Sequence, residues 1–253
     1  ARPHKIKMLV NDFKSRMKEE SGSIPIQGKK NKFYFKQKKG HNYPTYYAKV
    51  GCDDIEILNL EALSKNHAYF SVEDINLSYD ENYIAFAIDF TGNRLCKLFI
   101  KPTFSNDYKE IYVNKKTNPL VNTHNMLSYS TLNSGNCVWS CDSKLIYYIT
   151  YDKAIRPCKL YYYNIETKKH HFVYEEKDKN CSLSVSGVES GNHIVLYSST
   201  YNGSKVFIVT DKHVSCVYSL KKDVDYLLSH MYSTWIVFKN YNMNILFFCT
   251  HTI

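Results

Sequence analysis

Residues 77–92 read Leu77-Ser78-Tyr79-Asp80-Glu81-Asn82-Tyr83-Ile84-Ala85-Phe86-Ala87-Ile88-Asp89-Phe90-Thr91-Gly92. They begin with a polar turn around Asp80. An apolar strand over residues 83–88 and a break from Asp89 to Gly92 follow. Because a second strand pattern occupies residues 95–101, this stretch predicts one antiparallel hairpin.

The same order of turn, strand, break and strand recurs downstream. A second copy starts at residue 138 with Asp142 in its turn, a third starts at residue 188, and a weaker fourth covers residues 227–249. The turns are 62 residues apart from Asp80 to Asp142, and 48 residues apart from Asp142 to Ser190. Repeats near this length, each supplying about four short strands, are typical of β-propeller blades. We therefore predict an all-β chain that forms an incomplete β-propeller of about four blades.

The composition fits such a fold and indicates neither export nor membrane insertion. The 253 residues include 23 Tyr and 13 Phe, which favour strands, and 44% of the chain is hydrophobic. Every apolar run is shorter than the roughly 18 residues of a membrane span. The first five residues, Ala1-Arg2-Pro3-His4-Lys5, lack the apolar segment of a signal peptide. We expect a cytoplasmic protein without a membrane partner, and a chain that starts at a fragment boundary, since Ala1 stands where Met would.

The cysteines and histidines do not form the patterns of metal sites. Eight cysteines are spread singly, and Cys137 and Cys141 lack the two-residue gap of a zinc-binding pair. The pair His170-His171 follows two lysines in a predicted hairpin turn, so we expect it to be solvated. The sequence predicts reduced cysteines, no metal and no other cofactor.

The net charge of +9 raises the possibility of a Lys-rich nucleic-acid-binding domain. Only four of the 33 basic residues are Arg, however, and Arg is the residue that suits bidentate phosphate and base contacts. The lysines are also scattered along the chain. We therefore expect no nucleic-acid partner.

The predicted elements divide the chain into an N-terminal extension and a propeller. Residues 1–31 form a helical extension in which Leu9, Phe13 and Met17 share one helix face. Residues 32–253 form the partial propeller, which begins with a hairpin over residues 32–50. An Asn-, Lys-, Thr- and Ser-rich stretch at about 102–133 is predicted to be an inserted loop with one extra strand.

Several short motifs occur in a fixed order over most of the chain. They are Lys39-Gly40-x-x-Tyr43-Pro44, Ile57-Leu58-Asn59-Leu60-x-x-Leu63, Leu77-Ser78-x-Asp80, Ala85-x-x-x-Asp89-x-x-Gly92, Val138-Trp139-Ser140-x-Asp142, Tyr147-Tyr148-x-x-x-Asp152-x-x-x-Arg156-Pro157 and Val173-Tyr174-Glu175-Glu176-Lys177-Asp178. In these motifs the chain resembles the propeller of the prolyl oligopeptidase family of serine peptidases, and within it the oligopeptidase B (protease II) branch. It departs from the family's usual Ser-Pro-Asp turn, because Tyr79 replaces the proline.

This resemblance implies a cytoplasmic peptidase in which a seven-bladed propeller covers an α/β-hydrolase domain. The propeller would admit short peptides, cleaved after basic residues, and exclude folded proteins. The family's Gly-x-Ser-x-Gly nucleophile motif does not occur in this sequence. We therefore expect no catalytic residue here, a non-catalytic isolated chain, and a C-terminal hydrolase domain of the same polypeptide as its partner. The alternative is a stand-alone propeller that serves as a protein-interaction scaffold.

The residues expected to matter are structural. Asp80 and Asp142 precede strands, where an Asp side chain can accept backbone N–H bonds, and Trp139 is expected to be buried between blades. The full set of predicted turn and blade residues is Asp80, Asp89, Gly92, Trp139, Asp142, Arg156 and Pro157. Four blades without a closed ring would leave two apolar blade faces uncovered, so we also expect self-association of the isolated chain.

Overall fold

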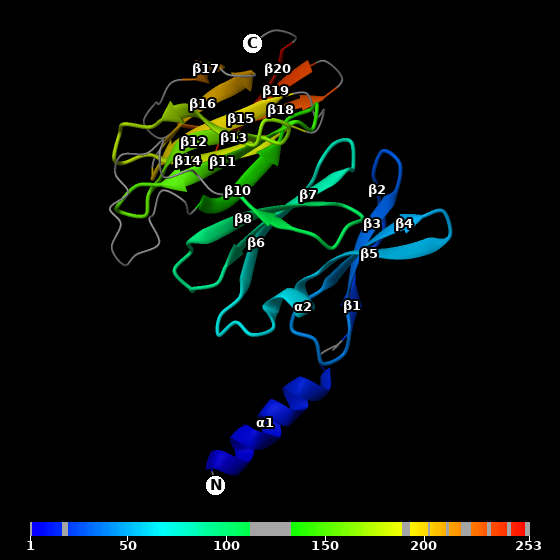
Figure 1. Ribbon diagram of the computed structural model, residues 1–253. Coiled ribbons are helices and arrows are strands. Elements are labelled where there is room, and N and C mark those ends of the chain that lie inside the picture. Colours follow the sequence, from blue (N-terminus) through cyan, green and yellow to red (C-terminus); the bar gives the residue numbers. More distant parts are fainter. Residues whose placement is uncertain are drawn as a thin grey trace, which may run out of the picture. The chain divides into compact units, whose positions relative to one another are not determined.

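The computed structural model describes residues 2–16, 20–111, 133–188, 193–201, 203–210, 213–218, 224–231, 234–241 and 244–250, the last three segments by their backbone alone. The chain falls into two compact units, residues 1–66 and residues 67–253. Figure 1 shows the elements of both. Among the described residues, no helix has the length and apolarity needed to cross a membrane.

The first unit contains a helix and one antiparallel sheet. Its elements are α1 (Arg2–Arg16), β1 (Ser21–Gly22), β2 (Ile26–Gln27), β3 (Lys32–Gln37), β4 (Thr45–Val50), β5 (Asp53–Asn59) and α2 (Leu60–Ser64). The strand order is β1-β3-β4-β5, with β2 also pairing with β3. Residues 21–22 and 26–27 therefore belong to the sheet of the first hairpin and not to the helical extension in which the sequence placed them. The predicted helix is real, with Leu9 and Phe13 exposed, and Met17 lies outside the described residues.

The second unit contains the repeats as successive antiparallel meanders. The first repeat sheet is β6 (Ser71–Leu77), β7 (Tyr83–Asp89), β8 (Cys96–Pro102) and β9 (Lys109–Glu110). The second repeat sheet is β10 (Asn133–Trp139), β11 (Leu145–Tyr151), β12 (Pro157–Asn164) and β13 (Lys169–Glu175). The third is β14 (Ser182–Gly187), β15 (Ile194–Thr200), β16 (Gly203–Thr210) and β17 (His213–Tyr218), and β18 (Val224–Met231), β19 (Thr234–Tyr241) and β20 (Asn244–Thr250) belong to the fourth.

This arrangement confirms the predicted all-β, incomplete propeller. Single ladder contacts, Asn133 with Cys96 and Gly203 with Val224, join neighbouring repeats along the chain. The sheet of the first unit is a further blade-like meander beyond the four repeats recognised in the sequence. Within the predicted insertion, β9 pairs with β8, and residues 112–132 lie outside the described part of the chain.

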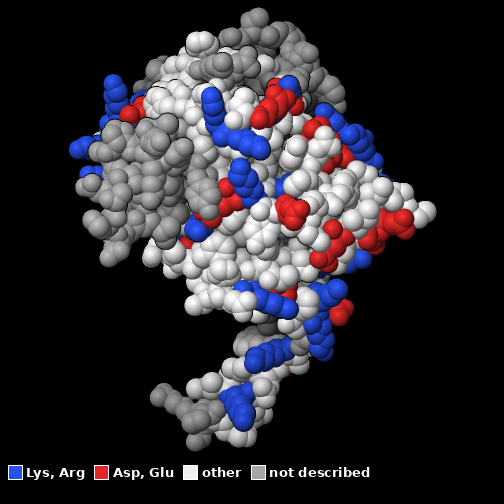
Figure 2. All heavy atoms as spheres, in the orientation of Figure 1, with Lys and Arg blue, Asp and Glu red and all other residues white. Residues whose placement is uncertain are grey.

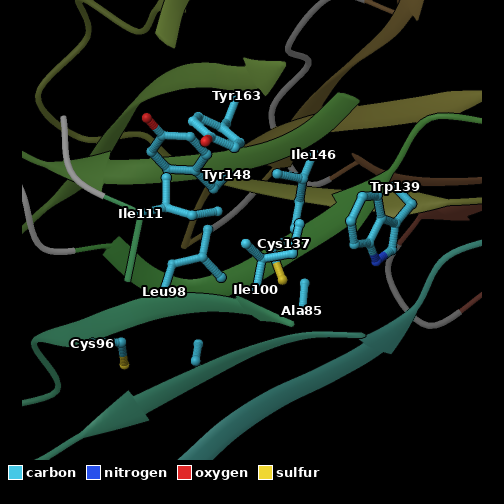
Figure 3. Packing of buried hydrophobic residues seen from close by; sticks show 11 residues of the cluster. Ala85, Cys96, Leu98, Ile100, Ile111, Cys137, Trp139, Ile146, Tyr148 and Tyr163 are labelled. Carbon is cyan, nitrogen blue, oxygen red and sulfur yellow. The ribbon is translucent and has the colours of Figure 1, made fainter. Parts of the chain in front are cut away.

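Two hydrophobic cores lie between the first three repeat sheets and hold them together. The first core, between the first and second repeat sheets, is shown in Figure 3 and contains Ala85, Ala87, Cys96, Leu98, Ile100, Ile111, Cys137, Trp139, Ile146, Tyr148 and Tyr163. The second core, between the second and third repeat sheets, contains Val138, Tyr147, Ile149, Leu160, Tyr162, Leu183, Val185, Ile194, Leu196, Phe207 and Val209. The second repeat sheet is thus buried on both faces along β10, β11 and β12.

Strand β11 shows how one segment serves both cores. Side chains alternate across a strand, so Ile146 and Tyr148 enter the first core while Tyr147 and Ile149 enter the second. Ile146 and Ile149 are both completely buried. Each buried side chain of this size contributes roughly 1.5–3 kcal/mol. Burial on both faces explains why the strand is continuously apolar in sequence rather than alternating with polar residues.

A glycine allows the first two repeat sheets to approach closely. Gly135 lies where the pairing of β10 with β11 shifts register, and its φ is +81°. A Cβ placed there would lie 2.5 Å from the Cβ of Glu73 in β6 and 3.3 Å from Cys96 Sγ. Gly92 has nearly the same φ, +79°, but a Cβ there would meet only the Tyr69 ring at 3.5 Å. Comparing the two positions therefore distinguishes the cost of the left-handed backbone from the cost of steric crowding.

We expect Gly135→Ala to destabilise the chain more than Gly92→Ala. The left-handed backbone alone costs an alanine about 1 kcal/mol, so Gly92→Ala should lower the free energy of unfolding by about that amount. Gly135→Ala should cost about 1–3 kcal/mol more, because Glu73 and the backbone must move. Urea-induced unfolding of both variants measures the difference. Equal losses would mean that the first two repeat sheets are farther apart than described.

Candidate functional site

The turn between β6 and β7 is built on Ser78 and Asp80. The Ser78 hydroxyl donates to Asp80 Oδ1 at 2.6 Å and accepts from the Tyr83 N–H at 2.9 Å. Asp80 Oδ1 also accepts from the Asn82 N–H at 3.1 Å. Burial acts to raise the pKa of Asp80, but the hydrogen bonds from Ser78 and Asn82 outweigh it and the pKa lies below its ordinary value. Asp80 therefore remains a charged acceptor in the folded chain.

Ser140 and Asp142 build the same turn between β10 and β11. The Ser140 hydroxyl donates to Asp142 Oδ1 at 2.5 Å and accepts from the Leu145 N–H at 2.9 Å. The Lys144 N–H donates to Asp142 Oδ1 at 3.0 Å. The 62-residue repeat thus extends to individual hydrogen bonds.

The two turns are also bonded to each other. The residue after each Asp has a left-handed backbone, with φ of +64° at Glu81 and +60° at Ser143. Ser143 is only 4% exposed, and its hydroxyl accepts from the Asp80 N–H at 3.0 Å. The first turn of one repeat sheet is therefore held against the first turn of the next.

Asp89 organises the loop at the other end of β7. It is 1% exposed, and its Oδ1 accepts from the Thr91 N–H and hydroxyl, both at 2.7 Å, and from the Gly92 N–H at 3.1 Å. Its Oδ2 accepts from the Arg94 N–H at 2.7 Å. The Tyr151 hydroxyl of β11 donates to the Arg94 carbonyl at 2.9 Å. This loop is therefore attached to the second repeat sheet.

The corresponding loop of the second repeat sheet is built on Asp152 and Arg156. Asp152 Oδ1 accepts from the Ala154 and Arg156 N–H groups at 2.9 and 3.0 Å, and Arg156 Nε donates to Asp152 Oδ2 at 3.0 Å. Pro157 begins β12 and is half-buried. A strand start is a position that tolerates the missing N–H of proline.

Arg156 also holds the connection from the second to the third repeat sheet. Its Nη1 donates to the carbonyls of Asp178 at 2.6 Å and Cys181 at 2.8 Å, and its Nη2 donates to the Glu176 carbonyl at 3.3 Å. The planar fork of donors on a guanidinium suits such converging carbonyls, and a lysine could not reproduce it.

Glu176, in the same connection, is a buried acid that the sequence analysis quoted within a motif but gave no role. It is 4% exposed, and its Oε2 accepts from the Ser198 hydroxyl at 2.6 Å and from Lys205 Nζ at 3.1 Å. Burial acts to raise the pKa of Glu176, but the bonds from Ser198, the Asp178 N–H and Lys205 outweigh burial and lower the pKa below its ordinary value. No sequence pattern connects Glu176 with Lys205, which lies in another repeat.

A second missed feature links the first strands of neighbouring repeat sheets. Asp74 Oδ2 in β6 accepts from the Cys137 N–H in β10 at 3.2 Å. Asn136 Oδ1 in β10 accepts from the Val185 N–H in β14 at 2.6 Å. Asp74 and Asn136 are 62 residues apart, and Cys137 and Val185 are 48 apart, like the turns. Aligning the repeats by their turns could have revealed this pair.

Trp139 lies in the first core and is 2% exposed (Figure 3). Its indole Nε1 donates to the Asn76 carbonyl of β6 at 3.0 Å, and its ring centroid lies 6.3 Å from that of Tyr83. The indole N–H therefore has a hydrogen-bond acceptor although the ring is buried in an apolar contact between two repeat sheets.

Two of the remaining reactive side chains, Cys96 and His170, stay neutral in the described part of the chain. There, no group of three or more His, Cys, Asp or Glu is placed to hold a metal ion. Burial raises the pKa of Cys96 to about 12, which keeps it a thiol. The expectation that the pair is solvated holds for His171, which is exposed, but was wrong for His170. Its Nδ1 lies 2.7 Å from the Tyr148 hydroxyl, and burial lowers the pKa of His170 to about 4.

Comparison with known proteins agrees with this arrangement. Residues 3–245 match the model of the "Prolyl oligopeptidase, N-terminal beta-propeller domain" family. The chain belongs to the prolyl oligopeptidase family. It is 25% identical over 221 residues to Protease 2 of Moraxella lacunata, covering 82% of this chain. It is 21% identical over 257 residues to dipeptidyl aminopeptidase BI of Pseudoxanthomonas mexicana, covering 92%.

Solved structures show the same fold. Oligopeptidase B from Leishmania major matches 98% of this chain and 36% of its own, with a TM-score of 0.77 and 18% identity. Oligopeptidase B from Trypanosoma brucei, with covalently bound antipain, matches 96% of this chain and 34% of its own, with the same TM-score and identity. The chain spans 29% and 33% of the two curated relatives, so it corresponds to the propeller portion of longer family members.

In this family member, we expect Asp74→Asn to stabilise the chain at neutral pH. Burial raises the pKa of Asp74, so the folded chain binds its proton more tightly than the unfolded chain does. The stability contribution of Asp74 is therefore complete below its unfolded pKa and is lost as the pH rises through the folded one. An asparagine keeps the acceptor oxygen without this loss, as Asn136 does at the equivalent position.

Urea-induced unfolding at pH 4 and pH 7 tests this expectation. Asp74→Asn should have a higher free energy of unfolding than the parent at pH 7. This difference should become smaller toward pH 4. The matched exchange Asn136→Asp should be less stable than the parent at pH 7, with its deficit shrinking at pH 4. A less stable Asp74→Asn at both pH values would contradict the assignment.

Proposed function

We propose that this chain is the substrate-gating propeller of a serine oligopeptidase of the oligopeptidase B type. The observation that supports this most strongly is the match to oligopeptidase B structures over nearly the whole chain, together with face-to-face packing of successive repeat sheets. In this proposal the propeller admits short peptides to a hydrolase domain elsewhere in the same polypeptide. That domain cleaves them after basic residues, in the cytoplasm.

The chain itself is proposed to be non-catalytic. Peptide hydrolysis by a serine nucleophile needs an adjacent base and an oxyanion hole in one constellation. The sequence contains no Gly-x-Ser-x-Gly motif. Its prominent acids, Asp80, Asp89 and Glu176, have their oxygens occupied by hydrogen bonds from neighbouring residues.

The predicted turn and blade residues are proposed to set the spacing and order of the blades. Asp80 and Asp142 fix the first turns, and Asp89 with Gly92 fixes a loop at the opposite end. Arg156 with Pro157 fixes the start of β12 and the connection beyond β13. Trp139 joins two repeat sheets through Asn76. Their substitution should therefore change stability before it changes the chemistry of the whole enzyme.

The partners proposed are the hydrolase domain and, for the whole enzyme, short peptides. Nucleic acid and membrane are not among them. On the face shown in Figure 2, acidic side chains lie among the basic ones rather than leaving a continuous basic surface. Counterion release drives nucleic-acid binding most strongly where many basic groups face the phosphates together.

We expect the chain alone to release no fluorophore from an Arg- or Lys-amide substrate, and the polypeptide that joins it to a hydrolase domain to do so. A serine-directed phosphonate should abolish the activity of the joined polypeptide. Activity should fall steeply with peptide length, while a version without residues 67–250 should lose this length dependence.

Three outcomes would contradict the proposal in whole or in part. Phosphonate-sensitive hydrolysis by the purified chain would show that it carries its own nucleophile. A joined polypeptide that cleaves long and short peptides equally would retain the peptidase assignment but remove the gating role. Stable capture of a folded protein by the chain, with no hydrolase domain in the polypeptide, would favour the scaffold alternative.

A further inference from the structure

Tyr79 occupies the turn of the first repeat sheet and packs beside the first core. It is half-buried, and burial raises the pKa of its hydroxyl. The neighbouring Asp80 N–H is bonded to Ser143 in the second repeat sheet. The Tyr79 backbone is thus held in place, and its ring extends from a fixed point.

The Tyr79 ring reaches the third repeat sheet. A Cβ placed on Gly187, the last residue of β14, would lie 3.2 Å from the Tyr79 hydroxyl oxygen and 3.1 Å from Val138 Cγ2. Gly187 is not among the described glycines with positive φ, so its backbone does not require glycine. The missing side chain instead leaves room for Tyr79 and Val138.

We propose that Tyr79 and Gly187 form a strap that couples the first repeat sheet directly to the third, across the first turn of the second. Most contacts in stacked repeats join only neighbours, so stability is close to a sum of neighbouring terms. The strap adds a contact between non-neighbouring repeats. The first three repeat sheets then move as one body, and any opening of the propeller takes place elsewhere.

A double-mutant cycle in the full chain tests the strap. The variants are Tyr79→Phe, Gly187→Ala and their combination, with equilibrium unfolding in urea as the readout. The added methyl meets the Tyr79 hydroxyl, so Gly187→Ala should raise the unfolding constant more in the parent than in the Tyr79→Phe background. The two increases should differ by at least about threefold, a usual size for residues in contact.

Tyr201→Phe is the matched control, because Tyr201 is fully exposed in the turn between β15 and β16 of the third repeat. The effects of Tyr201→Phe and Gly187→Ala on the free energy of unfolding should add. If Gly187→Ala prevents folding, hydrogen exchange of the single variant Tyr79→Phe replaces the double-mutant cycle as the test. Faster exchange of the β14 amides than in Tyr201→Phe supports the strap. Additive effects in the Tyr79 cycle, or unchanged β14 exchange when exchange is the readout, would overturn it.

Discussion

The two-sided burial of the second repeat sheet is the constraint on which the rest of the described structure depends. Strand β11 supplies Ile146 to one core and Ile149 to the other, so neither of its faces is available to water. Shifting its pairing by one residue would exchange the side chains of the two cores, which differ in shape. Close packing makes both cores sensitive to such a change. The sheets on either side are positioned by this one.

Apolar burial is not directional, so it does not by itself fix how one sheet lies against the next. The polar contacts between repeats supply that direction. Asp74 and Asn136 each accept from the following repeat, and Trp139 donates back to Asn76. Glu176 is buried, and its charge is paired with that of Lys205. The turns and loops add further polar contacts between repeats, as Ser143 and Arg156 do, because the backbone there also needs partners.

The sequence predicted the repeats because their turns carry the same side chains at the same offsets, as Ser78 with Asp80 and Ser140 with Asp142 do. It predicted a strand after the Asp142 turn from the repeat, but not which core each residue of β11 enters. Strands β1 and β2 were missed because two-residue strands leave no periodic pattern. His170 was misplaced because a turn-like sequence does not reveal that Tyr148 lies across from it. The bond from Lys205 to Glu176 depends on how two repeats meet, which no local pattern encodes.

Hydrogen exchange of the second repeat sheet tests the central claim most directly. If this sheet is buried on both faces, the hydrogen-bonded amides of β11 should exchange only through global unfolding. The free energy of opening calculated from their protection factors should then equal the free energy of unfolding measured in urea. The amides of β13, at the edge of the same sheet, should exchange at least about tenfold faster through local opening. Exchange of β11 as fast as that of β13 would contradict the account.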